Sequence, residues 1–322
     1  MMVDAFRCAG LAGILLALSS GITCAETYPT RPVTISVGYS AGAGMDVAAR
    51  FFAAKLSKAS GQQFIVVNRP GAGGNLAAQE VAQAKPDGYQ LLWGPTATFA
   101  ANPSLFKQLP YDPRTSYTLV STVVEYGFLL VTGPQTPAST IPALKALLAG
   151  KPKATYGGLG STTVAIAERF KSMAGIKAAH VTYKAMQEVV RDVSAADVDF
   201  AMVDVPFAMQ QAKNGKLKIF GVTLPHRMAA APDIPTLSEA GVPGFEATGW
   251  MALAAPAGTP ADVVAQVRGW IIAALGEPDT KTFLRENYYE PFTLDPAKTD
   301  QFLKDQIEKW RELITAAGIE PI

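Results

Sequence analysis

The chain is poor in cysteine and histidine, with two of each among its 322 residues. Cys8 and Cys24 both lie within the first 25 residues, so the rest of the sequence has no thiol. That part can have no thiolate metal site, thiol nucleophile or redox CxxC motif. His180 and His226 are far apart in sequence and form no HExxH motif, which makes a zinc hydrolase improbable.

An excess of charge of either sign is also missing. The 28 Lys and Arg residues oppose 27 Asp and Glu residues, which gives a formal net charge of +1. Nucleic-acid binding requires concentrated basic residues that neutralise phosphates, so we expect no nucleic-acid partner. No low-complexity tract or charge block predicts a disordered tail. With 49% hydrophobic residues, the composition is that of a globular protein with a sizeable core.

Common enzyme motifs are absent as well. Gly38, Gly42 and Gly44 do not have the spacing of a GxGxxG dinucleotide fingerprint, and no glycine-rich loop ends in GK[ST]. There is no GxSxG nucleophile elbow, and neither histidine has an evident nucleophile or orienting acid. The sequence therefore predicts no catalytic residue, no metal site and no cofactor.

The beginning of the chain has the pattern of a secretory leader. The apolar run Cys8–Ile22 follows a short segment that ends in arginine, and small residues precede a cleavage point after Ala25. This run is shorter than the roughly 18 residues that predict a membrane span. We expect residues 1–25 to be a signal peptide. A lipoprotein site at Cys24 is disfavoured, because Gly21 stands where a large aliphatic residue is usual.

The rest of the chain alternates strand and helix patterns, which predicts the α/β class. Each predicted strand is followed by a loop of small residues and then by an amphipathic helix. The expected strands are 33–39, 63–67, 89–93, 153–157 and 198–203, and the expected helices are 45–60, 75–84, 163–174, 207–214, 261–275 and 299–317.

Two further apolar segments, 127–132 and 248–255, each run into a proline-rich turn. We expect them to pair side by side as the two crossovers between two lobes. Lobe 1 would then be discontinuous, with residues 26–126 plus 254–322, and lobe 2 would comprise residues 127–253.

Four loops at the carboxyl ends of predicted strands are candidates for ligand binding. Ligands of open α/β sheets bind at these ends, and helix N-termini there offer free N–H groups and a positive dipole to an anion. The simplest ligand is a small carboxylate held mainly by backbone amides. The loops are 40–44, 94–99, 158–162 and 204–206, and their candidate hydroxyl groups belong to Ser40, Thr96, Thr98, Ser161 and Thr162.

These residues also have purely structural interpretations, because small residues after a strand serve in turns and caps. We expect Asp46 to cap its helix or complement the dipole. Asp204 either caps the following helix or faces the pocket, where an ionised carboxylate would repel an anion unless it accepted a hydrogen bond. Trp93, Trp250 and Phe128 lie on apolar strands and are expected in the core.

Seven segments carry a family pattern over nearly the whole chain after residue 25. They are YPTRPVTISVGYSAGAGMDVAAR (28–50), VVNRPGAGGNLAAQEVAQAKPDGYQLLWG (66–94), ANPSLFKQLPYDP (101–113), HVTYK (180–184), NGKLKIFGVT (214–223), PDIPTLSEAGVPGFEATGW (232–250) and PAGTP (256–260). In these segments the chain resembles the substrate-binding components of tripartite tricarboxylate transporters, the Bug family of periplasmic receptors.

The resemblance implies a two-lobed periplasmic binding protein fold, in which each lobe is a sheet flanked by helices and two crossover strands join the lobes. It also implies export to the periplasm of a Gram-negative cell and closure around a small carboxylate ligand. The expected partners are integral-membrane permease subunits; a signalling receptor is the alternative, and a secreted enzyme is least favoured. The implied contacts are Tyr39, Ser40, Ala41, Gly42, Thr96, Thr98, Phe99, Leu159, Gly160, Ser161, Thr162 and Asp204.

The sequence departs from the common family pattern in three loops. Ala43 replaces a glycine, Phe99 stands where a histidine is frequent, and Met186 follows a position that usually holds glycine. We therefore expect more apolar walls, formed by Tyr39, Phe99, Met186 and Phe207. They favour an aromatic or otherwise apolar-bodied carboxylate, such as a benzene dicarboxylate, over a tricarboxylate. A C4–C6 dicarboxylate is the alternative.

Overall fold

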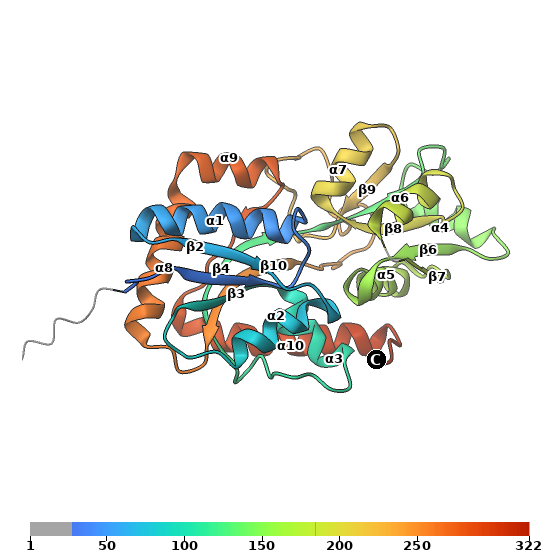
Figure 1. The fold of residues 1–322 in the computed structure, drawn as a ribbon. Coiled ribbons are helices and arrows are strands. Elements are labelled where there is room, and N and C mark those ends of the chain that lie inside the picture. Colours follow the sequence, from blue (N-terminus) through green and yellow to red (C-terminus); the bar gives the residue numbers. More distant parts are fainter. Residues whose placement is uncertain (1–27, 184, 322) are drawn as a thin grey trace, which may run out of the picture.

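The computed structural model describes residues 28–183 and 185–321, which form two lobes, each around one sheet (Figure 1). The expected signal peptide, with its cleavage point and both cysteines, lies outside the described residues. Within the described residues, no helix has both the length and the apolar character needed to span a membrane. The predicted strands and helices are confirmed, with their ends shifted by at most three residues.

Lobe 1 contains a six-stranded mixed sheet. The strands β1, β2 and β3 run parallel to one another, and their residues are almost all buried or half-buried, as expected where helices cover both faces. Strand β10 lies between β3 and β4 and runs antiparallel to both. In spatial order the strands are β11 (Glu290–Pro291), β4 (Tyr117–Tyr126), β10 (Gly249–Pro256), β3 (Gln90–Pro95), β1 (Val33–Val37) and β2 (Phe64–Asn68).

Helices cover both faces of this sheet. Apolar residues of α1 and α8 pack with Ile35 and Trp93 on one face, whereas α2 and α10 pack with Leu92 on the other. Successive strand residues point to opposite faces, so β3 serves both cores. The helical segments are α1 (Gly44–Ser60), η1 (Ala72–Gly74), α2 (Asn75–Ala82), η2 (Ala97–Ala101), α3 (Asn102–Leu105), α8 (Ala261–Gly276), α9 (Pro278–Glu286) and α10 (Pro296–Ala316).

Lobe 2 contains a five-stranded mixed sheet. Its order is β7 (Ala179–Thr182), β6 (Thr155–Gly158), β8 (Phe200–Asp204), β5 (Phe128–Thr132) and β9 (Lys218–Val222). The first three of these run parallel, and β5 is antiparallel to both of its neighbours. Its helices are α4 (Ile141–Ala149), α5 (Gly160–Ala174), α6 (Met186–Ser194) and α7 (Val205–Lys213).

The two apolar crossover segments do not pair with each other as expected. β5 belongs to the sheet of lobe 2 and β10 to that of lobe 1, so each segment leads from the crossing into a different lobe. The crossings themselves lie together, because Gly249 pairs with Tyr126, and the Thr223 hydroxyl accepts from the Phe128 amide and donates to the Ala247 carbonyl. The second crossing therefore precedes Gly249, and residues 249–253 belong to lobe 1 rather than lobe 2.

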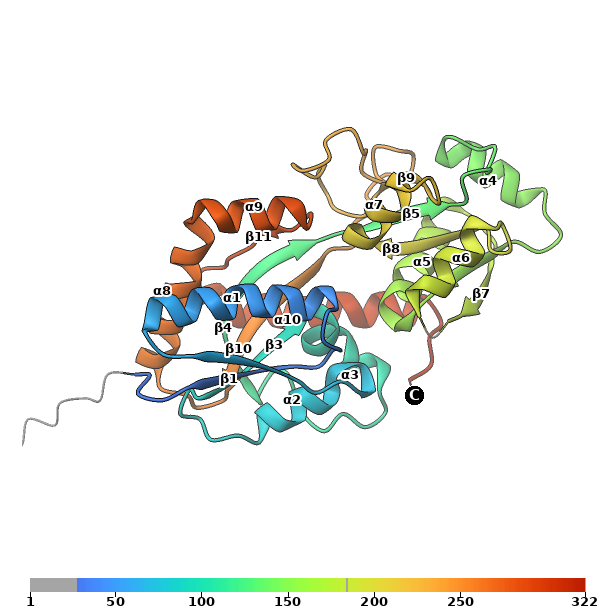
Figure 2. The same ribbon diagram turned by 45° about the horizontal axis from the view of Figure 1, so that its top comes forward.

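A third link between the lobes comes from the last helix. The long helix α10 runs along lobe 1 and contacts α5 of lobe 2 (Figures 1 and 2). Beside this contact, Lys309 forms an ion pair of 2.7 Å with Glu246, just before the second crossing. Helix α10 thus adds a contact between the lobes to the two strand crossings.

Candidate functional site

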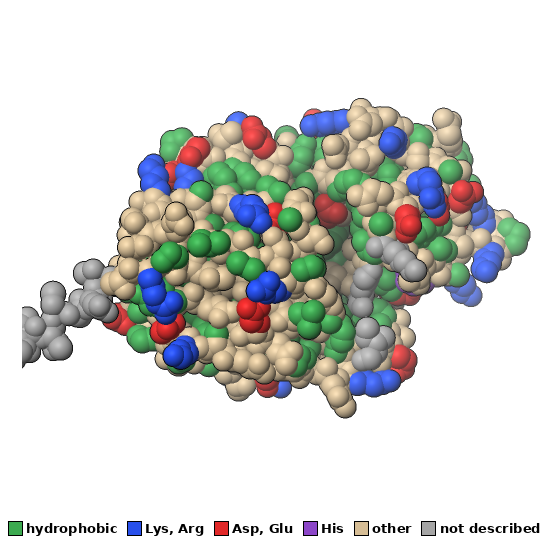
Figure 3. All heavy atoms as spheres, viewed as in Figure 1, with side chains coloured by type: hydrophobic (Ala, Val, Ile, Leu, Met, Phe, Trp, Pro, Cys, Tyr) green, Lys and Arg blue, Asp and Glu red, His purple; other side chains and the backbone are tan. Residues whose placement is uncertain are grey.

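A cavity of about 490 Å³ lies between the two lobes, where the space-filling surface is hollowed (Figure 3). Its walls come mainly from the carboxyl ends of β1, β3, β6 and β8 and from the two crossings. This is the expected position for a ligand in open α/β sheets. The described lining residues are Tyr39, Met45, Gly73, Pro95, Thr96, Ala97, Asn102, Leu105, Phe106, Tyr126, Phe128, Leu159, Thr162, Asp204 and Gly249.

Two loops of lobe 1 meet closely beside the cavity. A Cβ atom at Gly38 would lie 2.5 Å from the Cα of Gly74, so only glycine allows the loops after β1 and β2 to approach in this way. The contact brings Gly73 and Tyr39 to the same wall. Sequence patterns predict the glycine-rich turn before α2 but do not place it in the site.

The first loop is held by the buried carboxylate of Asp46. It accepts hydrogen bonds from the Gly42 amide at 2.8 Å, from Arg50 and from Asn68. Burial alone would raise the pKa of Asp46, but these hydrogen bonds outweigh it and lower the pKa below its usual value. Of the two expected roles, the structure supports the second: Asp46 lies in the first turn of α1, where a negative charge complements the helix dipole, whereas the N-cap itself is Ala43. The Gly42 amide therefore already has a hydrogen-bond acceptor within the loop and is not free to donate to a ligand.

The start of α1 is still open to a ligand. Its N-cap residue, Ala43, provides no side-chain acceptor for the first turn of the helix. The amides of Gly44 and Met45 are among those that an α-helix leaves unsatisfied at its N-terminus. Met45 itself lines the cavity, so a carboxylate there would meet these N–H groups and the positive end of the dipole.

The expected hydroxyl groups of the second loop serve the structure. The Thr96 hydroxyl accepts from the Trp250 amide at 2.7 Å and donates to the Trp250 carbonyl at 3.2 Å. Thr98 is buried, and its side chain hydrogen-bonds with Tyr39. Thr96 still lines the cavity, but its oxygen has two backbone partners.

The expected role of Phe99 as a wall is wrong. Its side chain is fully buried, stacked on Trp250 at 5.8 Å between ring centroids and edge-on to Tyr117. The residue lies in η2, a wide helical turn that directs its ring into the core of lobe 1. Phe106, beyond α3, provides an aromatic wall instead.

Two other expected walls also lie elsewhere. Phe207 lines a separate surface hollow of lobe 2 together with Gln187 and Lys216. Met186 begins α6 and is not among the described residues that line the cavity. Helix α7 points Phe207 away from the cavity even though Asp204, its N-cap residue, lies in the wall.

Lobe 2 contributes the N-terminus of α5. Leu159 and Thr162 line the cavity, and the N-cap Leu159 provides no side-chain acceptor. The Thr163 hydroxyl accepts from the Leu159 amide and donates to its carbonyl, which fixes this turn. The side chains at positions 160 and 161 lie outside the described part of the structure.

Asp204 has both roles that the sequence left open. Its carboxylate accepts from the Phe207 amide at 3.2 Å as the N-cap of α7, and it lines the cavity. Burial raises the pKa of Asp204 above its usual value, although backbone hydrogen bonds oppose the shift. Because no Lys, Arg or His lines the described cavity, Asp204 is its one ionisable acid or base besides the tyrosines.

Tyrosine hydroxyl groups supply polar contacts in a largely apolar wall. Burial raises the pKa of Tyr39 to about 12, and burial together with Tyr39, Tyr289 and Asp204 raises that of Tyr126 well above its usual value. Both side chains are therefore neutral near pH 7 and can donate to an anion. Their neighbours in the wall, Leu105 and Phe128, are apolar.

Some of these wall residues could not be found from sequence patterns. Phe128 was expected only in the core, whereas the structure places it both in the core and at the cavity. Tyr126 ends β4, a strand that the pattern of parallel units did not predict. Trp93 and Trp250 are core residues as expected.

Comparison with known proteins finds a matching family and related sequences. The sequence model for "Tripartite tricarboxylate transporter family receptor" matches residues 48–319. A UPF0065 protein of Bordetella bronchiseptica is 33% identical over 315 residues, which cover 97% of this chain and 93% of that protein.

Two solved structures with bound acids have the same fold. Rpa4515 of R. palustris with adipate is 32% identical, with a TM-score of 0.83 over 92% of this chain and 100% of that one. MatC from Rhodopseudomonas palustris with bound malate is 28% identical, with a TM-score of 0.76 over 89% of this chain and 100% of that one.

Proposed function

The chain belongs to the tripartite tricarboxylate transporter receptor family, and on that premise we propose that it captures a dicarboxylate with an apolar body by closure of its two lobes. It is a solute-binding receptor of this family and not an enzyme. Each lobe contributes loops at the carboxyl ends of its strands, so a ligand in the cavity would contact both lobes. Ligand contacts with both lobes stabilise the closed form relative to the open form.

One observation carries the proposal. The cavity has uncapped N-termini of α1 and α5 on its opposite walls, and no cationic side chain among its described lining residues. Each terminus can bind one carboxylate through backbone amides and the helix dipole. Two such sites suit two carboxylates better than three. The contacts that we propose are Tyr39, Ser40, Ala41, Thr96, Leu159, Gly160, Ser161, Thr162 and Asp204, with Tyr126 and Phe106 added.

The wall between these termini favours an apolar ligand body. Met45, Leu105, Phe106 and Phe128 offer only carbon and sulfur atoms to a ligand through their side chains. The relative with adipate contains a six-carbon dicarboxylate, which supports a ligand of about this length. A benzene dicarboxylate has the same two charges on a flat apolar body. Because Phe99 does not line the cavity, the wall gives less reason to prefer an aromatic ligand. We therefore propose adipate and phthalate as equal first candidates.

A thermal-shift screen tests this proposal. The protein is heated with mono-, di- and tricarboxylates, in aliphatic and aromatic pairs of equal charge. A ligand at 100 times its Kd stabilises the native state by about 2.7 kcal/mol, which raises the Tm of a chain of this size by several degrees. We expect dicarboxylates to give the largest shifts. A larger shift with citrate, or shifts that follow charge alone, would contradict the proposed ligand class.

We also propose that the closed receptor delivers its ligand to permease subunits from the periplasm. Deletion of the gene should then abolish uptake of the labelled ligand. Induction of genes by the same ligand should persist if transport is its role. Lost induction with normal uptake would favour a sensor partner instead.

A further inference from the structure

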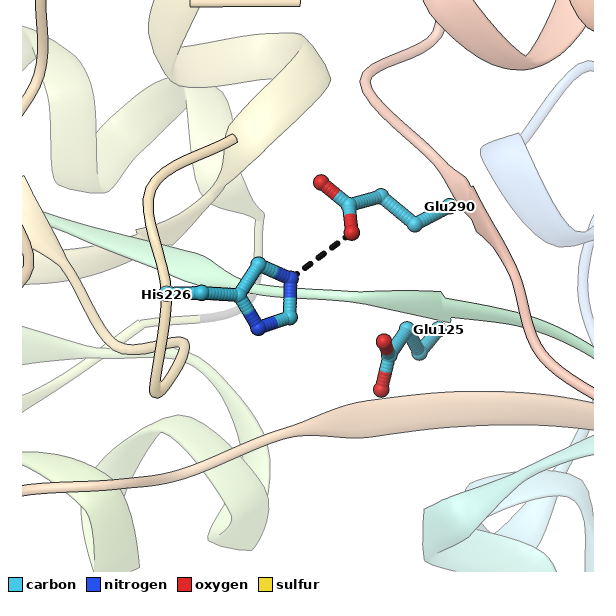
Figure 4. A group of neighbouring side chains, drawn as sticks. All are labelled: Glu125, His226 and Glu290. Atoms are coloured by element: carbon cyan, nitrogen blue, oxygen red, sulfur yellow. Dashed lines mark hydrogen bonds and ion pairs between the residues drawn. The ribbon is translucent and has the colours of Figure 1, made fainter. Parts of the chain in front are cut away.

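Glu125, His226 and Glu290 bring their side chains together where the two lobes meet (Figure 4). None of the three lines the interlobe cavity. Glu125 lies near the end of β4 and Glu290 on β11, both in lobe 1, whereas His226 lies in the loop after β9 of lobe 2. The cluster is therefore a polar contact between lobes that the proposed carboxylate site does not use.

The two glutamates are directly opposite each other in the sheet. Glu290 pairs with Glu125 in the antiparallel ladder of β11 and β4. Like charges in such a pair are destabilising, so this arrangement favours a cation nearby. The imidazole of His226 thus lies beside two carboxylates that face each other across the ladder.

The donor atoms are close enough to share one ion. One ligand atom from each residue lies within 4.8 Å of the others, and His226 Nε2 is 2.7 Å from Glu290 Oε2. Zinc bonds of about 2.0–2.2 Å in a tetrahedron place ligand atoms about 3.4 Å apart. The present spacings, 2.7 Å for one pair and at most 4.8 Å for all three, lie on either side of that value.

We propose that Glu125, His226 and Glu290 form a site for a divalent transition metal, with zinc as the best fit, that joins the two lobes beside their crossing. One imidazole nitrogen with two carboxylates suits zinc, copper or nickel, whereas calcium and magnesium prefer an all-oxygen set. Three protein ligands leave a fourth position for water. His226 is 45% exposed, so an ion can reach the site from solvent.

Neighbouring contacts hold part of the site in place before an ion arrives. The second oxygen of Glu290 accepts from the Ala229 amide at 3.2 Å, which ties the His226 loop to lobe 1. In the turn between α9 and β11, Tyr288 has a φ of 54°, which is unusual for a residue with a side chain. An ion bound here would hold the lobes in the arrangement of Figure 1. The proposal does not rest on the identity of the carboxylate ligand.

Calorimetric titration of zinc chloride into the untagged, EDTA-treated protein tests the site. We expect one zinc ion per chain, and at least tenfold weaker binding in Glu125→Gln, His226→Gln and Glu290→Gln. His180→Gln is the matched control, because it removes the other described histidine, which lies on β7 of lobe 2. Zinc should raise the Tm of the wild type and of the control but not of His226→Gln.

Each other result would overturn the proposal. Equal zinc affinity in the wild type and His226→Gln would show that the ion binds elsewhere. Loss of binding in His180→Gln would place it at the other histidine. No binding of zinc by the wild type would leave the cluster as a hydrogen-bonded contact between His226 and Glu290. If His226→Gln fails to fold, the two glutamate variants decide.

Discussion

Replacing Gly249 by alanine is expected to weaken ligand binding by moving one tyrosine ring. Gly249 is the first residue of β10, pairs with Tyr126 and lines the cavity with it. An added Cβ would lie 2.5 Å from both Cε2 and Cζ of that ring. Ordinary contacts begin near 3.4 Å, so the ring or the strand has to move by about 0.9 Å.

The ring has little free space to move into. Phe128 and Tyr289 lie at 5.8 and 6.1 Å from Tyr126 between ring centroids, so a shift of the ring disturbs its packing, the cavity wall or both. Overpacking of this kind costs about 1–3 kcal/mol of folding stability. A ring displaced into the cavity also takes space from the ligand. We expect the affinity for adipate or phthalate to fall by about 10–100-fold, or about 1.4–2.8 kcal/mol.

Calorimetry gives the Kd, and urea unfolding gives the stability of the same samples. Gly269→Ala is the matched control, since Gly269 lies within α8 and an added Cβ there meets no atom within 4 Å. Alanine in a helix interior is favoured over glycine by about 1 kcal/mol. The control should therefore bind as the wild type does and be equally or more stable.

Two outcomes would refute this reasoning. If Gly249→Ala binds with wild-type affinity and unfolds at the wild-type urea concentration, the close contact does not constrain the ring. If it loses stability but keeps its affinity, the ring moves without entering the ligand space, and Tyr126 is not part of the binding wall.

Three further variants test other contacts. Asp204→Asn keeps the helix cap but removes the charge, so the variant should bind a dicarboxylate more tightly than the wild type at pH 7. The two affinities should converge as the pH falls and Asp204 of the wild type is protonated. A ratio of the two Kd values that stays constant with pH in calorimetry contradicts this. Since the folded pKa of Asp204 is raised, its ionisation also opposes folding, and its contribution to stability should decline as the pH rises through that pKa. Thr96→Val leaves the buried amide and carbonyl of Trp250 without their partner, which should cost about 2–4 kcal/mol in urea unfolding; a loss below about 1 kcal/mol would mean that water replaces the hydroxyl. Phe99→His should destabilise the fold by about 2–4 kcal/mol without changing the preference between phthalate and adipate, and a changed preference would return Phe99 to the wall in place of Phe106.

Local patterns in the sequence carry most of the fold. Alternating strand and helix patterns place the sheet strands and their helices, because hydrophobic periodicity depends on local geometry. The same patterns identify the loops at carboxyl ends of strands, where the cavity lies. The placement of Asp46 in the first turn of α1 is also a local relation, and its partner Gly42 is only four residues away.

Relations between distant segments required the tertiary structure. β10 pairs with β4 rather than with β5, which moves the start of the returning part of lobe 1 to Gly249. Sequence patterns cannot give this pairing, because periodicity predicts which residues of a strand are buried but not which strand lies beside it.

The same limit applies to single side chains at the site. The sequence correctly marks Phe99 as a large apolar residue in a site loop, but the wide turn of η2 buries it against Trp250. Glu125 and His226 likewise have no local signal, since their neighbourhood depends on β11 and on the junction of the lobes. Periodicity determines which face a residue occupies within its own element, whereas the packing of elements determines whether that face meets the core, the cavity or the other lobe.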